Sequence, residues 1–158
     1  MATKGSVLIT GCSDDGIGSA LALTFAQRGF RVFATARNTG RMTKLQDLDN
    51  VTLLTLDVLN AKAIEAAVKA VSKETNGTLN YLVNNAGCNR FMPLLDEKID
   101  DAKKIYDTNV WGPLQLVQAF SSLLIEARGI VVFISSVSGY LNVPWQGKWI
   151  PVFALASL

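Results

Sequence analysis

A glycine-rich loop near the start of the chain has the residue types and spacing of a phosphate-binding site. Thr10 and Gly11 follow a short apolar run, and Gly16, Ile17 and Gly18 then open a segment with helical periodicity. Such a loop lets backbone N–H groups and the positive end of a helix approach a phosphate. The same spacing also occurs in simple tight turns, so the loop alone is a weak signal. The loop residues that we expect at a cofactor are Thr10, Gly11, Ser13, Gly16, Ile17 and Gly18.

A second short sequence, Asn84-Asn85-Ala86-Gly87, stands at the end of a later apolar run. Either stretch alone is common. A glycine-rich turn after one strand and this sequence after a later strand are specific together. They predict a fold that binds a nucleotide cofactor, with Asn85 and Gly87 among the residues that contact it.

The end of the second predicted strand bears on which cofactor is bound. Where a free ribose 2′-hydroxyl would usually meet an Asp or Glu, this chain has Arg37, shortly after Thr35. A guanidinium suits a 2′-phosphate, so NADP(H) is favoured over NAD(H), with Thr35 in the site and Arg41 as a second candidate contact. The alternative is that Arg37 is a solvated loop charge. Asp57, after the third predicted strand, either accepts a hydrogen bond from the adenine amino group or caps the next helix.

Length and composition restrict the function classes. The chain has 158 residues, 49% of them apolar, which suffices for the core of one domain. Its net charge of +2 comes from dispersed Lys and Arg, so no nucleic-acid partner is expected, and the absence of His disfavours a metal site. Because it has no presequence and no apolar run near the ~20 residues that span a bilayer, we expect a cytoplasmic protein. Cys12 and Cys88 are then packing residues and not a redox pair.

The elements that must position these residues alternate between strands and helices. Apolar, β-rich runs predict strands at residues 7–10, 31–36, 51–56, 79–83 and 129–135. Ile64, Ala67 and Val71 have the helical spacing of a face packed on a sheet, and glycines at 29 and 77 are expected to end the first two helices. Uninterrupted apolar runs belong to strands covered on both faces. We therefore expect an α/β fold, a Rossmann-like parallel sheet of about five strands with helices on both faces.

The predicted helix over residues 100–126 contains Pro113, which has no N–H to donate to the carbonyl of Asn109. One interpretation is a tolerated kink. The other is that the freed carbonyl and the Asn109 side chain face a polar site and hold a water there. The spacing leaves both interpretations open.

These sequences together resemble the short-chain dehydrogenase/reductase family, from Val7 to about Gly147. The glycine loop is similar to the family's TGxxxGxG motif but has four residues between Gly11 and Gly16 where three are usual. That form, with its TGC opening and the ATAR strand end, resembles the fungal branch that contains NADPH-dependent 1-acyldihydroxyacetone-phosphate reductases.

The resemblance implies roles for three residues. Asn85 would contact the ribose on the nicotinamide side, the Asn109 carbonyl would hold a relay water, and Ser136 would polarise the substrate carbonyl. The family's proton-donating Tyr, expected thirteen residues after Ser136, is Trp149, whose indole is too weak an acid. The Lys expected four residues further on is Phe153.

We therefore expect a C-terminally truncated member of the family that lacks its last two strands. Residues 1–147 would form an NADP-binding Rossmann-type domain, and residues 148–158 an aberrant tail. By resemblance the function is NADP(H)-dependent carbonyl reduction or alcohol oxidation on a small molecule, with this chain inactive because Tyr and Lys are absent. The alternative is a non-catalytic NADP(H)-binding sensor or interaction module. A methyltransferase using S-adenosylmethionine does not account for the Asn84–Gly87 sequence, and a homo-oligomer stays open.

Overall fold

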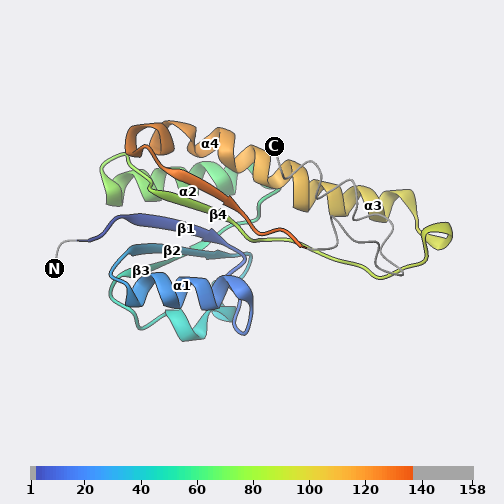
Figure 1. Cartoon of the computed structure of the whole chain (residues 1–158), viewed down its shortest axis with the longest axis horizontal. Helices are drawn as coiled ribbons and strands as arrows, with labels where there is room; N and C mark the ends of the chain where they lie inside the picture. Colours follow the sequence, from blue (N-terminus) through green and yellow to red (C-terminus); the bar gives the residue numbers. More distant parts are fainter. Residues whose placement is uncertain (1–2, 137–158) are drawn as a thin grey trace.

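The computed structural model describes residues 3–136, and a parallel sheet forms the centre of that part of the chain (Figure 1). Its strands lie in the order β3-β2-β1-β4-β5, and every neighbouring pair is parallel. The strand bounds are β1 Ser6–Thr10, β2 Arg31–Ala36, β3 Val51–Thr55, β4 Tyr81–Asn84 and β5 Ile130–Phe133. The expected Rossmann-like sheet is confirmed.

Helices cover both faces of this sheet, as expected. α1 (Ile17–Gln27) lies on one face, whereas α2 (Ala61–Thr75) and α4 (Gly112–Ala127) lie together on the other (Figure 1). Each helix crosses between two parallel strands, which is the connection that parallel neighbours require. The carboxyl ends of the strands therefore all point to one edge, where the connecting loops lie.

Alternation of side chains along the strands produces two cores. Leu8 and Phe33 of the sheet pack with Phe120 of α4 in the first core cluster. Ile9 packs with Ala22 of α1 in the second core cluster, on the opposite face. All five residues of β1 are buried, which explains why the strand is apolar without alternation. Burial of one such large side chain contributes about 1.5–3 kcal/mol.

The first two helices end where glycines predicted that they would. Gly29 and Gly77 follow α1 and α2 with φ of +84° and +82°, a conformation that glycine adopts at little cost. At its other end, α2 is capped by Asn60, whose Oδ1 accepts a hydrogen bond from the Ala63 N–H at 3.1 Å.

The helical region predicted over residues 100–126 has three parts. α3 (Ile99–Tyr106) passes into a π-helical turn at Asp107–Trp111, and α4 follows. In the π turn, the Gly112 N–H donates to the Asp107 carbonyl, five residues back. Pro113 therefore stands in the first turn of α4, where its missing N–H costs little. A π turn inside a helix is often found at functional sites.

Only β2 has the bounds that the sequence predicted. β1 begins one residue earlier, at Ser6, β3 ends one residue earlier, at Thr55, and both bounds of β4 and of β5 differ. β4 begins at Tyr81 and not at Leu79, because the Leu79 N–H donates to the Leu123 carbonyl of α4. β5 ends at Phe133, although the Ile134 N–H still donates to a β4 carbonyl. Within residues 3–136, β5 forms one edge of the sheet. In the same range, none of the helices combines the length and the apolar character that a membrane span needs.

Candidate functional site

The glycine loop between β1 and α1 forms a cradle that depends on missing side chains. A Cβ placed on Gly18 would lie 2.4 Å from the Gly11 carbonyl oxygen and 2.6 Å from Asn85 Nδ2, closer than such atoms can approach. Gly11 itself has a φ of +74°. α1 begins after Gly16 with no side-chain cap and no acidic residue in its first turn. Its first N–H groups are therefore open to an anion such as a phosphate.

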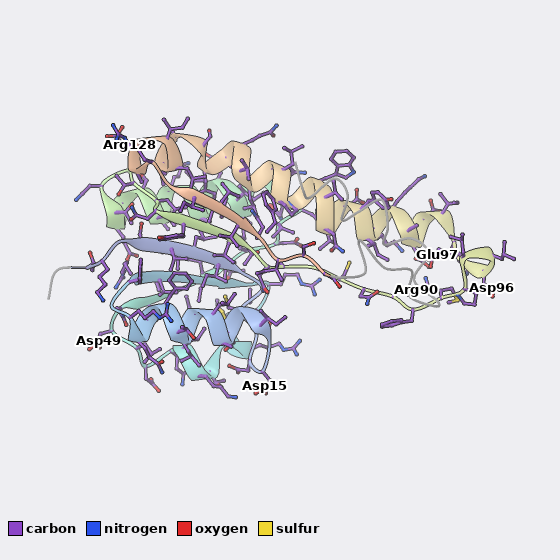
Figure 2. The ribbon with its side chains drawn as sticks, viewed as in Figure 1. Asp15, Asp49, Arg90, Asp96, Glu97 and Arg128 are labelled. Carbon is purple, nitrogen blue, oxygen red and sulfur yellow. The ribbon has the colours of Figure 1, made fainter. Side chains whose placement is uncertain are left out.

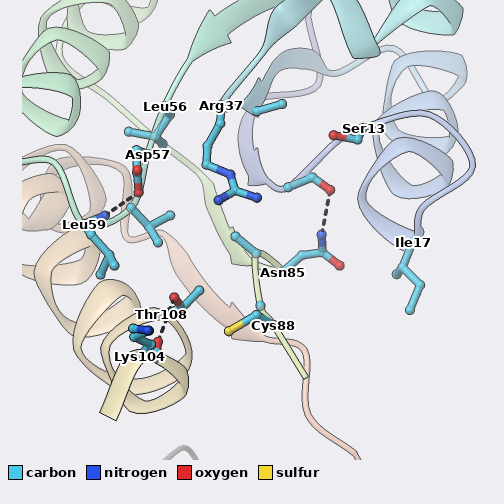
Figure 3. Close-up of a pocket in the computed structure, with 15 residues that line it drawn as sticks. Ser13, Ile17, Arg37, Leu56, Asp57, Leu59, Asn85, Cys88, Lys104 and Thr108 are labelled. Carbon is cyan, nitrogen blue, oxygen red and sulfur yellow. Dashed lines mark hydrogen bonds between the residues drawn. The ribbon is translucent and has the colours of Figure 1, made fainter. Parts of the chain in front are cut away.

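Asn85 ties this cradle to the end of β4. Its Nδ2 donates to the carbonyl oxygens of Thr10 and Gly11, at 2.7 and 3.1 Å. Figure 3 shows the second of these bonds as a dashed line from Asn85. Thr10 Oγ1 in turn accepts from the N–H groups of Asn85 and Ala86, at 3.0 and 2.9 Å. Hydrogen bonds between residues 74 to 76 positions apart thus join the two sequence motifs.

A cavity of about 480 Å³ opens beside the cradle, at the carboxyl edge of the sheet (Figure 3). Most of the predicted cofactor-binding residues line it, namely Gly11, Ser13, Ile17, Arg37, Asp57, Asn85 and Gly87. Gly16 and Gly18 shape the cradle without lining the cavity, and Thr10 and Thr35 are buried in the sheet at 1% exposure. The structure therefore places these two threonines in the sheet below the cavity, where they support the site and do not face a ligand.

Arg37 is exposed and carries its charge into the cavity. Figure 3 shows its guanidinium pointing toward the space between Asp57 and Asn85. Its side chain makes no ion pair or hydrogen bond with any other residue in the range 3–136. A cavity with a free guanidinium and an uncapped helix end fits a ligand that carries more than one phosphate group.

Asp57 also lines the cavity, but it does not cap α2. Its Oδ1 accepts from the Leu59 N–H at 3.0 Å, whereas the cap of α2 is Asn60. The helix-cap interpretation of Asp57 is therefore wrong. The contact with an adenine amino group stays a prediction.

Asn109 lies in the π turn and is paired with the loop that follows β4. Its Oδ1 accepts from the Cys88 N–H and its Nδ2 donates to the Cys88 carbonyl, both at 2.9 Å. A Cβ on Gly87 would lie 3.3 Å from Asn109 Oδ1, so glycine allows this close approach. Both polar atoms of the Asn109 side chain therefore hold the loop after β4 in place. Each atom can still make a second hydrogen bond, so a water held by the Asn109 side chain and carbonyl stays a prediction. The π turn also replaces the simple kink of the other interpretation.

Ser136 is exposed and follows the end of β5 by three residues, on the same edge of the sheet as the cavity. It is not among the residues that line the cavity. Residues 148–158, including Trp149 and Phe153, lie outside the described residues. The predicted catalytic role of Ser136 and the aberrant tail therefore stay predictions.

The structure adds cavity residues that the motifs did not indicate. Lys104 and Thr108, one helical turn apart, line the cavity from α3 and the π turn. Thr108 Oγ1 donates to the Lys104 carbonyl at 3.1 Å. Their spacing of four residues, just before Asn109, was the signal that could have placed them on one helix face.

The two cysteines differ from each other. Cys12 is fully buried in the second core cluster, and burial raises the pKa of its thiol to about 12, against the opposing hydrogen bond with Thr35. Cys88 is exposed and lines the cavity. The packing role is confirmed for Cys12 and is wrong for Cys88.

Comparison with known proteins identifies the family. Residues 5–149 match the short chain dehydrogenase family. The chain belongs to the short-chain dehydrogenase/reductase family. The resemblance drawn from the glycine loop and Asn84–Gly87 is thereby confirmed.

Individual relatives of this chain support the same family assignment. It is 54% identical over 142 residues to the short-chain dehydrogenase ptmH of Penicillium ochrochloron, covering 90% of this chain and 52% of that protein. It is 44% identical over 135 residues to the NADPH-dependent 1-acyldihydroxyacetone phosphate reductase of Schizosaccharomyces pombe, covering 85% of this chain and 45% of that protein. The solved structure of a short-chain dehydrogenase from Streptomyces avermitilis matches with a TM-score of 0.88 at 27% identity, covering 99% and 58% of the two chains. The chain spans about half the length of the curated relatives it matches.

Proposed function

We propose that this chain is the NADP(H)-binding portion of an oxidoreductase that reduces a carbonyl, or oxidises an alcohol, on a small molecule. Arg37 carries the choice of cofactor, because its unpaired guanidinium stands in the cavity where an acidic residue would favour a 2′-hydroxyl. The similarity to an NADPH-dependent reductase of Schizosaccharomyces pombe supports the same choice.

Each part of the site has its own task in this proposal. The glycine loop and the start of α1 present N–H groups to the diphosphate, and Arg37 binds the 2′-phosphate. Asn85 holds the loop against β4 and presents its side chain to the ribose on the nicotinamide side. When bound, the cofactor supplies or accepts a hydride. Ser136 donates a hydrogen bond that polarises the substrate carbonyl.

The 158-residue chain is inactive in this proposal. At the positions where the family carries the proton-donating Tyr and its Lys, this sequence has Trp149 and Phe153. Loss of general acid catalysis lowers a rate by about 10²–10⁴. The assay is NADPH oxidation by the purified chain with acyl-dihydroxyacetone phosphate and simple diketones. Turnover at ordinary reductase rates would refute the proposed inactivity.

A non-catalytic NADP(H)-binding sensor or interaction module is the second candidate. The observation that favours it is the complete cradle, with Gly11, Gly18 and Asn85 in place, beside the missing Tyr and Lys. Tight NADPH binding without turnover, together with a partner protein that binds only the loaded chain, supports this second function.

The proposal also includes a cytoplasmic location and the formation of a homo-oligomer. Cell fractionation tests the location, and light scattering tests the oligomeric state.

The cofactor choice is tested by calorimetry on the wild-type chain, Arg37→Ala and a matched control, Arg28→Ala. Arg28 is also exposed but lies at the far end of α1. We expect Arg37→Ala to weaken NADPH binding about tenfold, the size of a charge-assisted contact, and to leave NADH binding unchanged. Arg28→Ala should bind both cofactors like the wild type. Equal binding of NADPH and NADH by the wild-type chain would show that the cofactor assignment is wrong.

A further inference from the structure

The connection between β2 and β3 contains two short 3-10 helices, Thr39–Arg41 and Thr43–Leu45. We call residues 39–45 the basic segment, because it carries an arginine and a lysine. Met42 and Leu45 are fully buried in the second core cluster. These two side chains anchor the basic segment to the core and leave its polar side chains exposed.

Asp14 binds the basic segment to the glycine loop. Asp14 Oδ2 accepts from the N–H and the hydroxyl of Thr43, both at 2.9 Å, and Oδ1 accepts from the Lys44 N–H at 3.3 Å. The Asp14 N–H donates to the Arg41 carbonyl at 2.7 Å. Partial burial works against ionisation, but the hydrogen bonds from Thr43 and Lys44 outweigh it and lower the pKa of the Asp14 carboxyl. The carboxylate is therefore the form that holds the two segments together.

This contact lies beside the candidate cofactor site, whose cavity Ser13 and Arg37 line and Arg41 does not. Ser13, the neighbour of Asp14, lines the cavity, and the Arg41 backbone is bonded to Asp14 on the other side. Like Arg37, Arg41 is exposed, and its side chain makes no ion pair or hydrogen bond with the residues of range 3–136. Of the two cations on the basic segment, Lys44 pairs with Asp15, whereas Arg41 has no counter-ion within residues 3–136. Asp14 helps to set the position of the backbone that carries Arg41.

We propose that Asp14 is a positioning residue that fixes the basic segment relative to the glycine loop, so that one loop bound to the diphosphate also holds Arg41 toward the 2′-phosphate. This inference rests on the proposed NADP(H) binding. It gives a task to the loop of four residues between Gly11 and Gly16, because Asp14 lies inside that loop and reaches the basic segment with both carboxylate oxygens.

Asp15 supplies a matched control one residue away. It forms an ion pair with the Lys44 ammonium at 2.6 Å, but both side chains are well exposed, at 81% and 55%. Figure 2 shows Asp15 at the outer rim of the molecule. An exposed pair of this kind contributes little. Asp15 makes none of the backbone contacts that Asp14 makes with the basic segment.

The experiment measures NADPH and NADH dissociation constants by calorimetry for the wild-type chain, Asp14→Ala and Asp15→Ala. We expect Asp14→Ala to lower the preference for NADPH over NADH about tenfold, because the Arg41 contact is specific to the 2′-phosphate. Asp15→Ala should keep the wild-type preference. Circular dichroism checks that each variant is folded.

The outcomes separate this inference from the function on which it rests. A wild-type chain without preference for NADPH refutes both. If folded Asp14→Ala keeps the wild-type preference for NADPH, the positioning role alone is refuted. The same holds if the affinities for NADPH and NADH fall equally, because a merely structural role would weaken the binding of both cofactors alike. If Asp14→Ala does not fold, Thr43→Val, which removes one of the hydrogen bonds, must lower the preference in the same direction, and an unchanged preference refutes the inference.

Discussion

The site of Gly18 has no room for the methyl group of an alanine. A methyl group there would stand 2.4 Å from the Gly11 carbonyl, which is backbone and cannot rotate away. We expect Gly18→Ala to weaken NADPH binding more than about tenfold and to lower the free energy of unfolding by about 1–3 kcal/mol, as overpacking does. Calorimetry and urea denaturation measure the two effects.

The control for this substitution is Thr24→Ala, on the exposed side of the same helix. It removes a hydroxyl that bonds the Ala20 carbonyl and adds no atom near the cradle. It should bind NADPH like the wild type. If Gly18→Ala also binds NADPH like the wild type, Gly18 does not approach the Gly11 carbonyl closely in the folded chain.

α4 packs on the sheet through a buried apolar face, in which Phe120 is the largest side chain. Phe120 is fully buried and packs in the first core cluster with strand residues and α2. We expect Phe120→Ala to lower the free energy of unfolding by about 3–5 kcal/mol through lost burial and the cavity left behind. Urea denaturation measures this free energy, and an unchanged m-value shows that the variant exposes the same surface on unfolding.

Ile125 on the same helix provides the comparison, because its side chain is 77% exposed. Ile125→Ala should change the free energy of unfolding by less than about 0.5 kcal/mol. Similar losses for both variants would mean that the face of α4 toward the sheet is assigned incorrectly.

The candidate site takes residues from the ends of four strands, so cofactor binding should stabilise the molecule as a whole. Gly11, Arg37, Asp57 and Asn85 follow β1, β2, β3 and β4 in turn, and all line one cavity. A ligand that binds only the folded state at 100 times its dissociation constant adds about 2.7 kcal/mol. We expect NADPH to raise the melting temperature more than NADH at the same concentration.

The Arg37→Ala chain is the control for this thermal measurement. It should lose the difference between NADPH and NADH while keeping the melting temperature of the unliganded wild type, because the exposed Arg37 side chain makes no ion pair within residues 3–136. If NADH and NADPH raise the melting temperature of the wild-type chain equally, the expected preference for NADPH is wrong.

Local sequence signals predict both the parallel sheet and the glycine cradle. Apolar runs, glycines at helix ends and the glycine loop are local signals, since each depends on residues near one another in the chain. The family followed from the loop and from Asn84–Gly87, and the comparisons confirmed it. The predicted end of the second strand likewise places Arg37 at the carboxyl edge of the sheet.

Which side chains meet across the carboxyl edge of the sheet depends on how distant segments pack together. The pairing of Asn109 with Cys88 depends on a π turn, and the contact of Asp14 with Thr43 depends on the 3-10 helices between β2 and β3. Both contacts join residues more than twenty positions apart. Neither has a local periodicity or motif, because hydrogen bonds of this kind arise from the way elements pack and not from the residues next to them in the chain.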